Sequence, residues 1–374
     1  MSPDRYESLD LWRGVACLLV IVFHVFGYRP EGESSTAWWI AERTWIGVPL
    51  FFVISGYCIT AAAARSAVSD EPMRRFFWRR LRRIFPPAWC VLGAVAALMV
   101  AVPWLYSQPL SGFVPFIRPE TMTPWQWTGN VTLTFSWLYH ATGEPGRLLA
   151  HYWTLCYEEQ FYLVSGLAVV ASRRHWLPLL GIVTAVVIAA RVAIPTEDID
   201  GYFFDGRWLL FACGIGVYAH LHRASGLSRL CAPAACMAGL VWAVTSPDVH
   251  DARFPFSLEV LEASIFALVL MGLYTYDDRL AGRPRWLQWV GERSFSIYLV
   301  HWPISRAIVQ VATALGIVGF WPHAVTSLPF SVGVSLLAAA GFHVVVERRF
   351  VSRYRRPVNR ETRPRGPYEA ALSR

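Results

Sequence analysis

The chain has 374 residues, of which 55% are hydrophobic and only 16% are charged. Because a soluble domain carries about 25% charged residues, this composition argues against an ordinary soluble enzyme, and the abundant apolar and aromatic residues exclude a disordered chain. The net charge of +8 comes from 34 arginines without a lysine, but the long apolar runs leave little room for a soluble basic face that could bind nucleic acid. The composition therefore predicts a membrane protein.

About ten apolar stretches are long enough to cross a bilayer as helices, which takes roughly 20 residues each. In chain order they cover residues 9–28, 45–64, 86–106, 151–171, 176–194, 207–222, 227–246, 257–276, 295–319 and 324–346. The predicted fold class is all-α: a polytopic membrane protein with a membrane domain at 1–350. We expect the basic segment 351–374 to be a disordered cytoplasmic tail.

The arginines alternate between the connecting segments. With the N-terminus in the cytoplasm, 24 of the 34 arginines fall on the cytoplasmic side, and the opposite segments are neutral or acidic, as at 31–35 and 196–200. Positive charge is enriched in the cytoplasmic loops of membrane proteins. The pattern therefore predicts that both termini are cytoplasmic. The longest segment between spans, 107–150, would then lie outside, where we expect a lid or binding element without a recognisable strand or helix pattern.

The first span contains three ionisable residues, Asp10, Arg13 and His24. Each ionisable group in a membrane helix costs roughly 2.5–3.5 kcal/mol by insertion scales, so each requires a reason. Asp10 and Arg13 are three residues apart on one helical face, which suits either a simple ion pair or a functional role. His24 lies roughly 6 Å below the outer end by helical rise. It suits either a contact between helices or catalysis.

The fourth span contains a carboxylate that we expect at a depth similar to that of His24. Glu158 follows the start of this span by about seven residues, which is roughly 10 Å from the outer surface. A buried imidazole and carboxylate at one depth can form a general base and its orienting partner, which is what activation of a hydroxyl requires. Glu159 and Gln160 point elsewhere on the helix and are expected to serve packing.

A basic segment, MRRFFWRRLRRIFPP at 73–87, separates the second and third spans. It contains the pair Arg80 and Arg83, three residues apart. Such a segment can anchor the protein on anionic lipid heads. It can equally bind phosphate, because arginine presents paired donors to phosphate oxygens. Composition does not separate the two readings.

The other polar residues give weaker indications. His301 lies two turns into the ninth span, two residues before Pro303, which we expect to kink that span. The seven cysteines lie in or beside apolar stretches without CxxC spacing. We therefore predict neither a disulfide framework nor a metal site.

Six segments, taken in order, resemble the integral-membrane acyltransferase-three family, whose members include O-antigen and exopolysaccharide O-acetylases. The segments are LDLWRGVACLLVIVFH at 9–24, GVPLFFVISGY at 47–57, FFWRRLRRIFP at 76–86, HYWTLCYEEQFYL at 151–163, SFSIYLVHWP at 294–303 and VVERRF at 345–350. The departures are mild: Trp12 stands where leucine is usual, Thr154 and Cys156 stand where serine is common, and Arg349 stands where the family has proline.

The resemblance implies a bacterial inner-membrane enzyme that moves an acyl group, here expected to be acetyl, from cytoplasmic acyl-CoA to a hydroxyl of a sugar-containing acceptor. It makes His24 the candidate general base, and Glu158 the support of that histidine or of the acceptor. Arg13, Arg80 and Arg83 become candidates for binding acyl-CoA, with Asp10 ordering Arg13 and His301 in a supporting place. No bound cofactor is implied, since acyl-CoA would be a substrate.

A transporter is the main alternative, because polar residues in a ten-span bundle also suit a translocation path. Many transporters consist of two similar halves with interrupted helices, and this sequence has no internal repeat. The acceptor, the acyl length, an acyl-enzyme relay and the oligomeric state stay open at this point.

Overall fold

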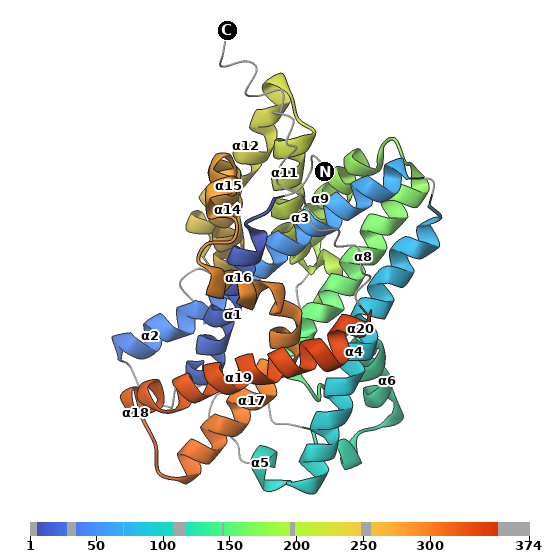
Figure 1. Ribbon diagram of the computed structural model, residues 1–374. Helices are drawn as coiled ribbons and strands as arrows, with labels where there is room; N and C mark the ends of the chain where they lie inside the picture. Colours follow the sequence, from blue (N-terminus) through green and yellow to red (C-terminus); the bar gives the residue numbers. More distant parts are fainter. Residues whose placement is uncertain are drawn as a thin grey trace.

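The computed structural model describes residues 6–27, 35–69, 71–107, 117–143, 146–194, 199–247 and 256–350, and every regular element within these ranges is a helix (Figure 1). Each of the ten predicted stretches overlaps one long helix, although the third helix begins at Met73, 13 residues before the stretch 86–106, and thus includes the basic segment. These helices are α1 (Leu9–Phe26), α3 (Gly47–Val68), α4 (Met73–Ala101), α8 (Trp153–Ala171), α9 (Trp176–Ala193), α11 (Trp208–His222), α12 (Cys231–Thr245), α14 (Phe256–Leu273), α17 (Ser294–Ala314) and α19 (Ser327–Phe342). The expected tail at 351–374 lies outside the described residues.

Seven helical segments of the described residues are long and apolar enough to cross a membrane. The other three long helices are α8, α11 and α17. Helix α11 is apolar but has only 15 residues, whereas α8 and α17 contain ionisable residues such as Glu158 and Arg306. A count of ten spans is therefore approximate. The chain is a polytopic all-α membrane protein, as predicted.

Short helices connect the long ones. They are α2 (Thr36–Glu42), η1 (Arg43–Ile46), α5 (Trp104–Ser107), η2 (Pro119–Thr121), α6 (Pro124–Thr132), α7 (Phe135–Thr142), η3 (Ala150–Tyr152), η4 (Phe203–Asp205), η5 (Gly226–Leu230), η6 (Tyr274–Tyr276), α15 (Asp277–Leu280), α16 (Arg285–Glu292), α18 (Phe320–Val325), the π-helical turn η7 (His343–Glu347) and α20 (Arg348–Phe350).

The segment 107–150 contains more helix than its sequence pattern indicated. Helix α6 begins with a capping box, in which the Thr123 hydroxyl accepts from the Gln126 amide and the Gln126 side chain accepts from the Thr123 amide. The Asn130 side chain then connects α6 to the segment before η3 by donating to the Gly146 carbonyl at 2.7 Å. A Thr followed three residues later by Gln is a recognised start signal. The expectation of no helical pattern in this segment was therefore wrong.

Helix α1 packs against α3, α16, α17 and α19, and therefore lies inside the bundle, while α3 packs on α11 and α17 packs on α19 (Figure 1). The inner end of α19 is fixed to α17 by a polar contact. The Ser296 hydroxyl donates to Glu347, and His343 Nδ1 lies 3.0 Å from the same carboxylate oxygen. Glu347 is thus a structural group that holds the last long helix in place.

Two pairs of helices approach so closely that only glycine fits between their backbones. A Cβ on Gly214 of α11 would lie 2.0 Å from the Val53 carbonyl oxygen of α3, and a Cβ on Gly56 would lie 2.2 Å from the Phe211 oxygen. Between α1 and α16, a Cβ on Gly291 would lie 1.5 Å from the Asp10 oxygen. Small residues let membrane helices pack backbone to backbone, which maximises their van der Waals contact.

The α3–α11 contact predicts a large difference between two glycine variants. Gly214→Ala must separate the two helices, which we expect to cost about 3 kcal/mol, at the upper end of overpacking effects. Gly181→Ala in α9 is the control, because nothing lies within 4 Å of its added methyl group, and helix propensity there favours alanine by up to about 1 kcal/mol. Thermal unfolding in detergent should show a lowered midpoint for Gly214→Ala alone. Equal midpoints would contradict the described contact.

Candidate active site

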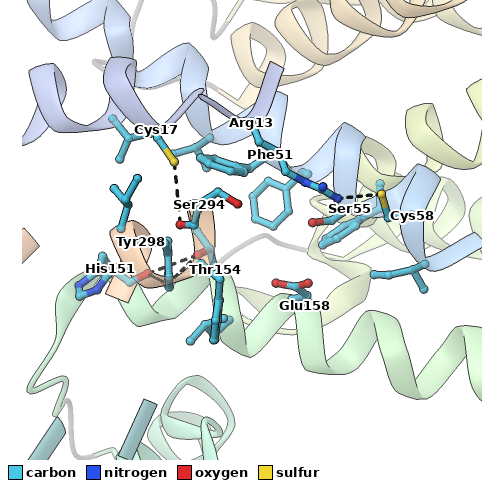
Figure 2. Close-up of a pocket in the computed structure, with 18 of the residues that line it drawn as sticks. Arg13, Cys17, Phe51, Ser55, Cys58, His151, Thr154, Glu158, Ser294 and Tyr298 are labelled. Carbon is cyan, nitrogen blue, oxygen red and sulfur yellow. Dashed lines mark hydrogen bonds between the residues drawn. The ribbon is translucent and has the colours of Figure 1, made fainter. Parts of the chain in front are cut away.

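One cavity of about 390 Å³ passes between α1, α3, α4, α8 and α17 (Figure 2). It is lined by all six residues for which the sequence suggested a direct role, whether catalytic, donor-binding or in support of catalysis: His24, Glu158, Arg13, Arg80, Arg83 and His301. These residues come from four different helices and are separated by up to 288 positions along the chain. The fold therefore brings distant motifs to one internal space.

One end of the cavity is strongly basic. Arg65 joins Arg13, Arg80 and Arg83 in the lining, and the distribution of arginines along the sequence predicts that this end faces the cytoplasm. The Arg80 guanidinium lies 3.6 Å from the centre of the Phe76 ring and 4.9 Å from that of Tyr162. Cation–π contacts of this kind hold a guanidinium in place without neutralising it. Arg80 therefore keeps its positive charge for an anionic ligand.

Asp10 lies behind this basic end and positions Arg13. The Arg13 guanidinium donates to the Asp10 carboxylate at 2.6 Å, and Gln288 of α16 donates to the second oxygen of Asp10 at 3.3 Å. The other side of the Arg13 guanidinium lies 2.9 Å from Cys58 Sγ inside the cavity. Asp10 itself does not appear in the cavity lining. Its contact with the cavity is thus made through Arg13.

Three histidines meet at the opposite end of the cavity, which is the outer end by the same orientation. The ring centres of His24 and His301 are 5.1 Å apart, and those of His151 and His301 are 5.5 Å apart. His301 is 2% exposed and His151 is 4% exposed. His151 also stacks on Trp302, and its carbonyl accepts from the Tyr298 hydroxyl at 2.6 Å. The rings are therefore held by packing and by backbone contacts.

Glu158 does not lie beside His24 as the matched depths suggested. The Tyr162 hydroxyl donates to the Glu158 carboxylate at 2.7 Å, and no hydrogen bond joins Glu158 to His24 among the described residues. Figure 2 shows Glu158 of α8 pointing into the cavity, apart from His151 in the turn that precedes this helix. The helix α8 begins after a 3₁₀ turn that contains His151, so His151 takes the level that the sequence argument gave to Glu158.

Three further cavity residues were not predicted from the sequence: His151, Arg65 and Tyr298. His151 stands at the start of the HYWTLCYEEQFYL segment, where it was treated as the edge of the span. Tyr298 stands one turn before His301, and its spacing of three was a usable indication that both face one side of α17. Arg65 closes an apolar helix in which nothing distinguishes it from an ordinary cytoplasmic anchor. Spatial proximity alone identifies it.

A second polar cluster fixes the wall of the cavity near the histidines. Arg207 lies 5.1 Å from the centre of the Trp153 ring and forms ion pairs with Asp205 at 3.1 Å and with Glu259 at 3.6 Å. Trp153 lines the cavity and stacks in parallel on Trp45, with ring centres 5.8 Å apart. Arg207 thus gives both buried carboxylates a positive partner, as buried charges require.

The fold and the cavity define a class of protein: a multi-pass membrane protein with a reaction-sized internal chamber that contains cations at one end and histidines at the other. A family model described as an acyltransferase domain matches residues 6–340 of the chain. Because this match covers nearly the whole chain, the protein belongs to that acyltransferase family. The resemblance drawn from the six motifs is confirmed.

Curated relatives agree with this assignment. The chain is 26% identical to "Putative peptidoglycan O-acetyltransferase YrhL" of Bacillus subtilis over 91% of its length. It is 28% identical to "Putative membrane-bound transacylase BcsY" of Komagataeibacter xylinus over 80% of its length. It is 24% identical to "Peptidoglycan O-acetyltransferase OatA" of Listeria monocytogenes over 83% of its length.

The alignments cover unequal shares of these relatives. The chain spans 54% of YrhL, 53% of OatA and 73% of BcsY. It therefore corresponds to about half of the two peptidoglycan O-acetyltransferases. No solved structure matches the chain.

The cavity predicts which side of the membrane can reach Cys58. This thiol is partly exposed and lines the basic end. In a variant whose only cysteine is Cys58, a charged methanethiosulfonate reagent should react in inside-out vesicles and not in right-side-out vesicles. A variant with only Cys156, which is 2% exposed, should not react in either. Reaction of Cys58 from the outer side would reverse the proposed orientation.

Proposed function

We propose that this protein is a membrane O-acyltransferase that moves an acyl group, most simply acetyl, from cytoplasmic acyl-CoA to a hydroxyl of a sugar-containing acceptor. The single observation that supports this most directly is the two-ended cavity. Four arginines lie at one end, and three histidines, whose rings can act as general bases, lie at the other. The membership of the acyltransferase family and the names of the relatives point in the same direction.

The arginine end suits the donor. Acyl-CoA carries phosphates, and guanidinium groups bind phosphate oxygens through paired donors. Arg13 and His24 are eleven residues apart on α1, which corresponds to about 16 Å along the helix. The long pantetheine arm of the donor would cover this separation inside the cavity. The phosphates would then stay at the cytoplasmic end while the thioester reaches the histidines.

The histidine end suits the reaction. In the proposed step, His24 takes the proton of the acceptor hydroxyl, and the oxygen attacks the thioester carbonyl. The new carbon–oxygen bond forms, the carbon–sulfur bond breaks, and the leaving thiolate of CoA takes the proton from His24, which returns to its neutral form. Glu158, held by Tyr162 beside Arg80, would orient the pantetheine amides or the acceptor through hydrogen bonds.

The acceptor is proposed as a sugar-containing molecule that meets the cavity from the outer side, in the inner membrane of a bacterium. The relatives named as peptidoglycan O-acetyltransferases support this class of acceptor. Trp153, Trp45 and the Arg207 cluster lie near the histidine end, where aromatic faces and charged groups can contact sugar rings and hydroxyls. The chemistry requires a hydroxyl and leaves the identity of the glycan open.

The proposal is tested by thiol release from acetyl-CoA with purified protein in nanodiscs and a panel of sugar acceptors. Wild type should release thiol only when an acceptor is present. His24→Ala should lower kcat by at least about 100-fold, the lower range for losing a general base. Thiol release that survives in His24→Ala would remove this residue from the chemistry, whereas absence of both release and acyl-CoA binding would favour a transporter.

The arginine end is tested separately by its effect on donor binding. Arg80→Gln and Arg83→Gln should each raise KM for acetyl-CoA about tenfold, because a charge-assisted hydrogen bond contributes about 1.5–3 kcal/mol. Arg174→Gln is the matched control, since Arg174 is exposed and does not line the cavity. An unchanged KM in both cavity variants would mean that these arginines serve only to anchor the protein on lipid heads.

A further inference from the structure

Four ring nitrogens at the histidine end lack a hydrogen-bond partner among the described residues. They are His24 Nδ1, His301 Nε2 and both nitrogens of His151. All three residues are buried, with at most 9% of their surface exposed. Because buried polar groups are nearly always hydrogen-bonded, four unpartnered nitrogens around one space indicate bonds that are completed in the working state of the site.

The proton of His301 has a fixed position. Its Nδ1 lies 2.9 Å from the carbonyl oxygen of Ile297 and 2.9 Å from that of Tyr298. A carbonyl oxygen can only accept, so Nδ1 must carry the proton of the neutral ring. The other nitrogen, Nε2, therefore presents a lone pair. His301 is thus a hydrogen-bond acceptor toward the cavity, and the backbone of its own helix fixes this role.

The acceptor nitrogen of His301 belongs to the ring next to His24. The two ring centres are 5.1 Å apart and the planes are inclined by 44°. The buried, unpartnered nitrogen of His24 is Nδ1, and the His24 ring lines the cavity. Two unpartnered nitrogens on adjacent rings, one of which can only accept, are suited to one shared proton.

We infer that His301 is a positioning residue for His24: it accepts the Nδ1 proton of His24 and so leaves the lone pair of His24 on Nε2, toward the acceptor hydroxyl. This inference rests on the proposed function. The resulting series runs from two backbone carbonyls through His301 to His24. It does what a carboxylate does behind a catalytic histidine, which is to fix the tautomer and the ring orientation.

A neutral orienting partner suits the site inside a membrane. A carboxylate at this depth would require its own counter-charge, and the nearest cavity carboxylate, Glu158, is instead bonded to Tyr162. When His24 takes the hydroxyl proton on Nε2, its Nδ1 proton stays on the hydrogen bond to His301. The positive charge formed on His24 strengthens that bond, so the partner stabilises the step without becoming charged itself.

His151 is the alternative partner of His301, because its ring centre lies 5.5 Å away and both its nitrogens are unpartnered. The other polar neighbours are engaged. The Tyr298 hydroxyl donates to the His151 carbonyl and accepts from Thr154 at 2.9 Å. Figure 2 shows Tyr298, His151 and Thr154 in this arrangement. The test must therefore separate His24 from His151.

The first measurement compares two substitutions of His301, one that keeps a hydrogen-bond acceptor and one that removes it. His301→Gln retains an acceptor oxygen near the position of Nε2, whereas His301→Phe retains the ring volume without an acceptor. We expect His301→Phe to lower kcat by about 100-fold, within the range for base catalysis, and His301→Gln to recover about tenfold of that loss. KM for acetyl-CoA should be unchanged in both. His323→Phe, a buried histidine that does not line the cavity, should retain wild-type kcat.

The second measurement does not depend on activity. Nitrogen-15 NMR of histidine-labelled protein in nanodiscs distinguishes the two neutral tautomers, and the His24 signal is identified by its loss in His24→Ala. We expect His24 to carry its proton on Nδ1 in wild type and in His151→Phe, and to change tautomer in His301→Phe. A His24 signal that is protonated on Nε2 in wild type, or that does not change in His301→Phe, would overturn the inference.

The two measurements fail independently. If thiol release depends on His24 while its tautomer is insensitive to His301, the positioning role is wrong and the proposed function stands. If the tautomer responds to His301 while no acceptor yields thiol release and acyl-CoA does not bind, the histidine arrangement stands and the acyltransfer proposal falls. If His301→Phe and His301→Gln lose activity equally, the acceptor atom is not what the site requires.

Discussion

The contact between α1 and α16 determines the geometry of both ends of the cavity. Gly291 of α16 lies directly against the Asp10 carbonyl, and Gly14 of α1 lies against the Leu287 carbonyl. One residue of α16, Gln288, bonds Asp10, which in turn holds Arg13 at the basic end. Helix α16 then leads into α17, which positions His301 beside His24. The α1–α16 contact therefore relates the basic end of the cavity to its histidine end.

The cavity separates two kinds of chemistry along one helix. Its inner end contains permanent positive charge that aromatic rings hold without neutralising, as Arg80 over Phe76 shows. Its outer end contains the three histidine rings, and the charges nearest to them in the wall are the ion pairs of Arg207 with Asp205 and Glu259. Excess positive charge favours an anionic ligand at the inner end, whereas opposite charges partly cancel at the outer end. The separation of about 16 Å along α1 keeps these demands apart.

The long helices could be predicted from the sequence, because a membrane helix is recognised by the length and hydropathy of its apolar stretch. The same holds for Arg13, Arg80, Arg83, His24 and His301, which are ionisable residues in or beside such helices. The depth of a side chain along its helix was predicted less well. Hydropathy does not show where a polar helix such as α8 enters, so Glu158 was set at the level that His151 occupies. The close glycine contacts could not be predicted from the sequence either, because the atoms that each glycine touches belong to another helix.

The glycine contacts bear on how substrates reach the chemistry. Alternating access requires one group of helices to rock against another as a rigid body. Here α3 and α11 touch backbone to backbone at Gly56 and Gly214, and α1 and α16 do so at Gly14 and Gly291. Such seams resist sliding, since each small displacement brings main-chain atoms into collision. The α3–α11 pair and the α1–α16 pair are thereby each held as one unit, so any rocking motion of the bundle would have to take place between such pairs rather than within them.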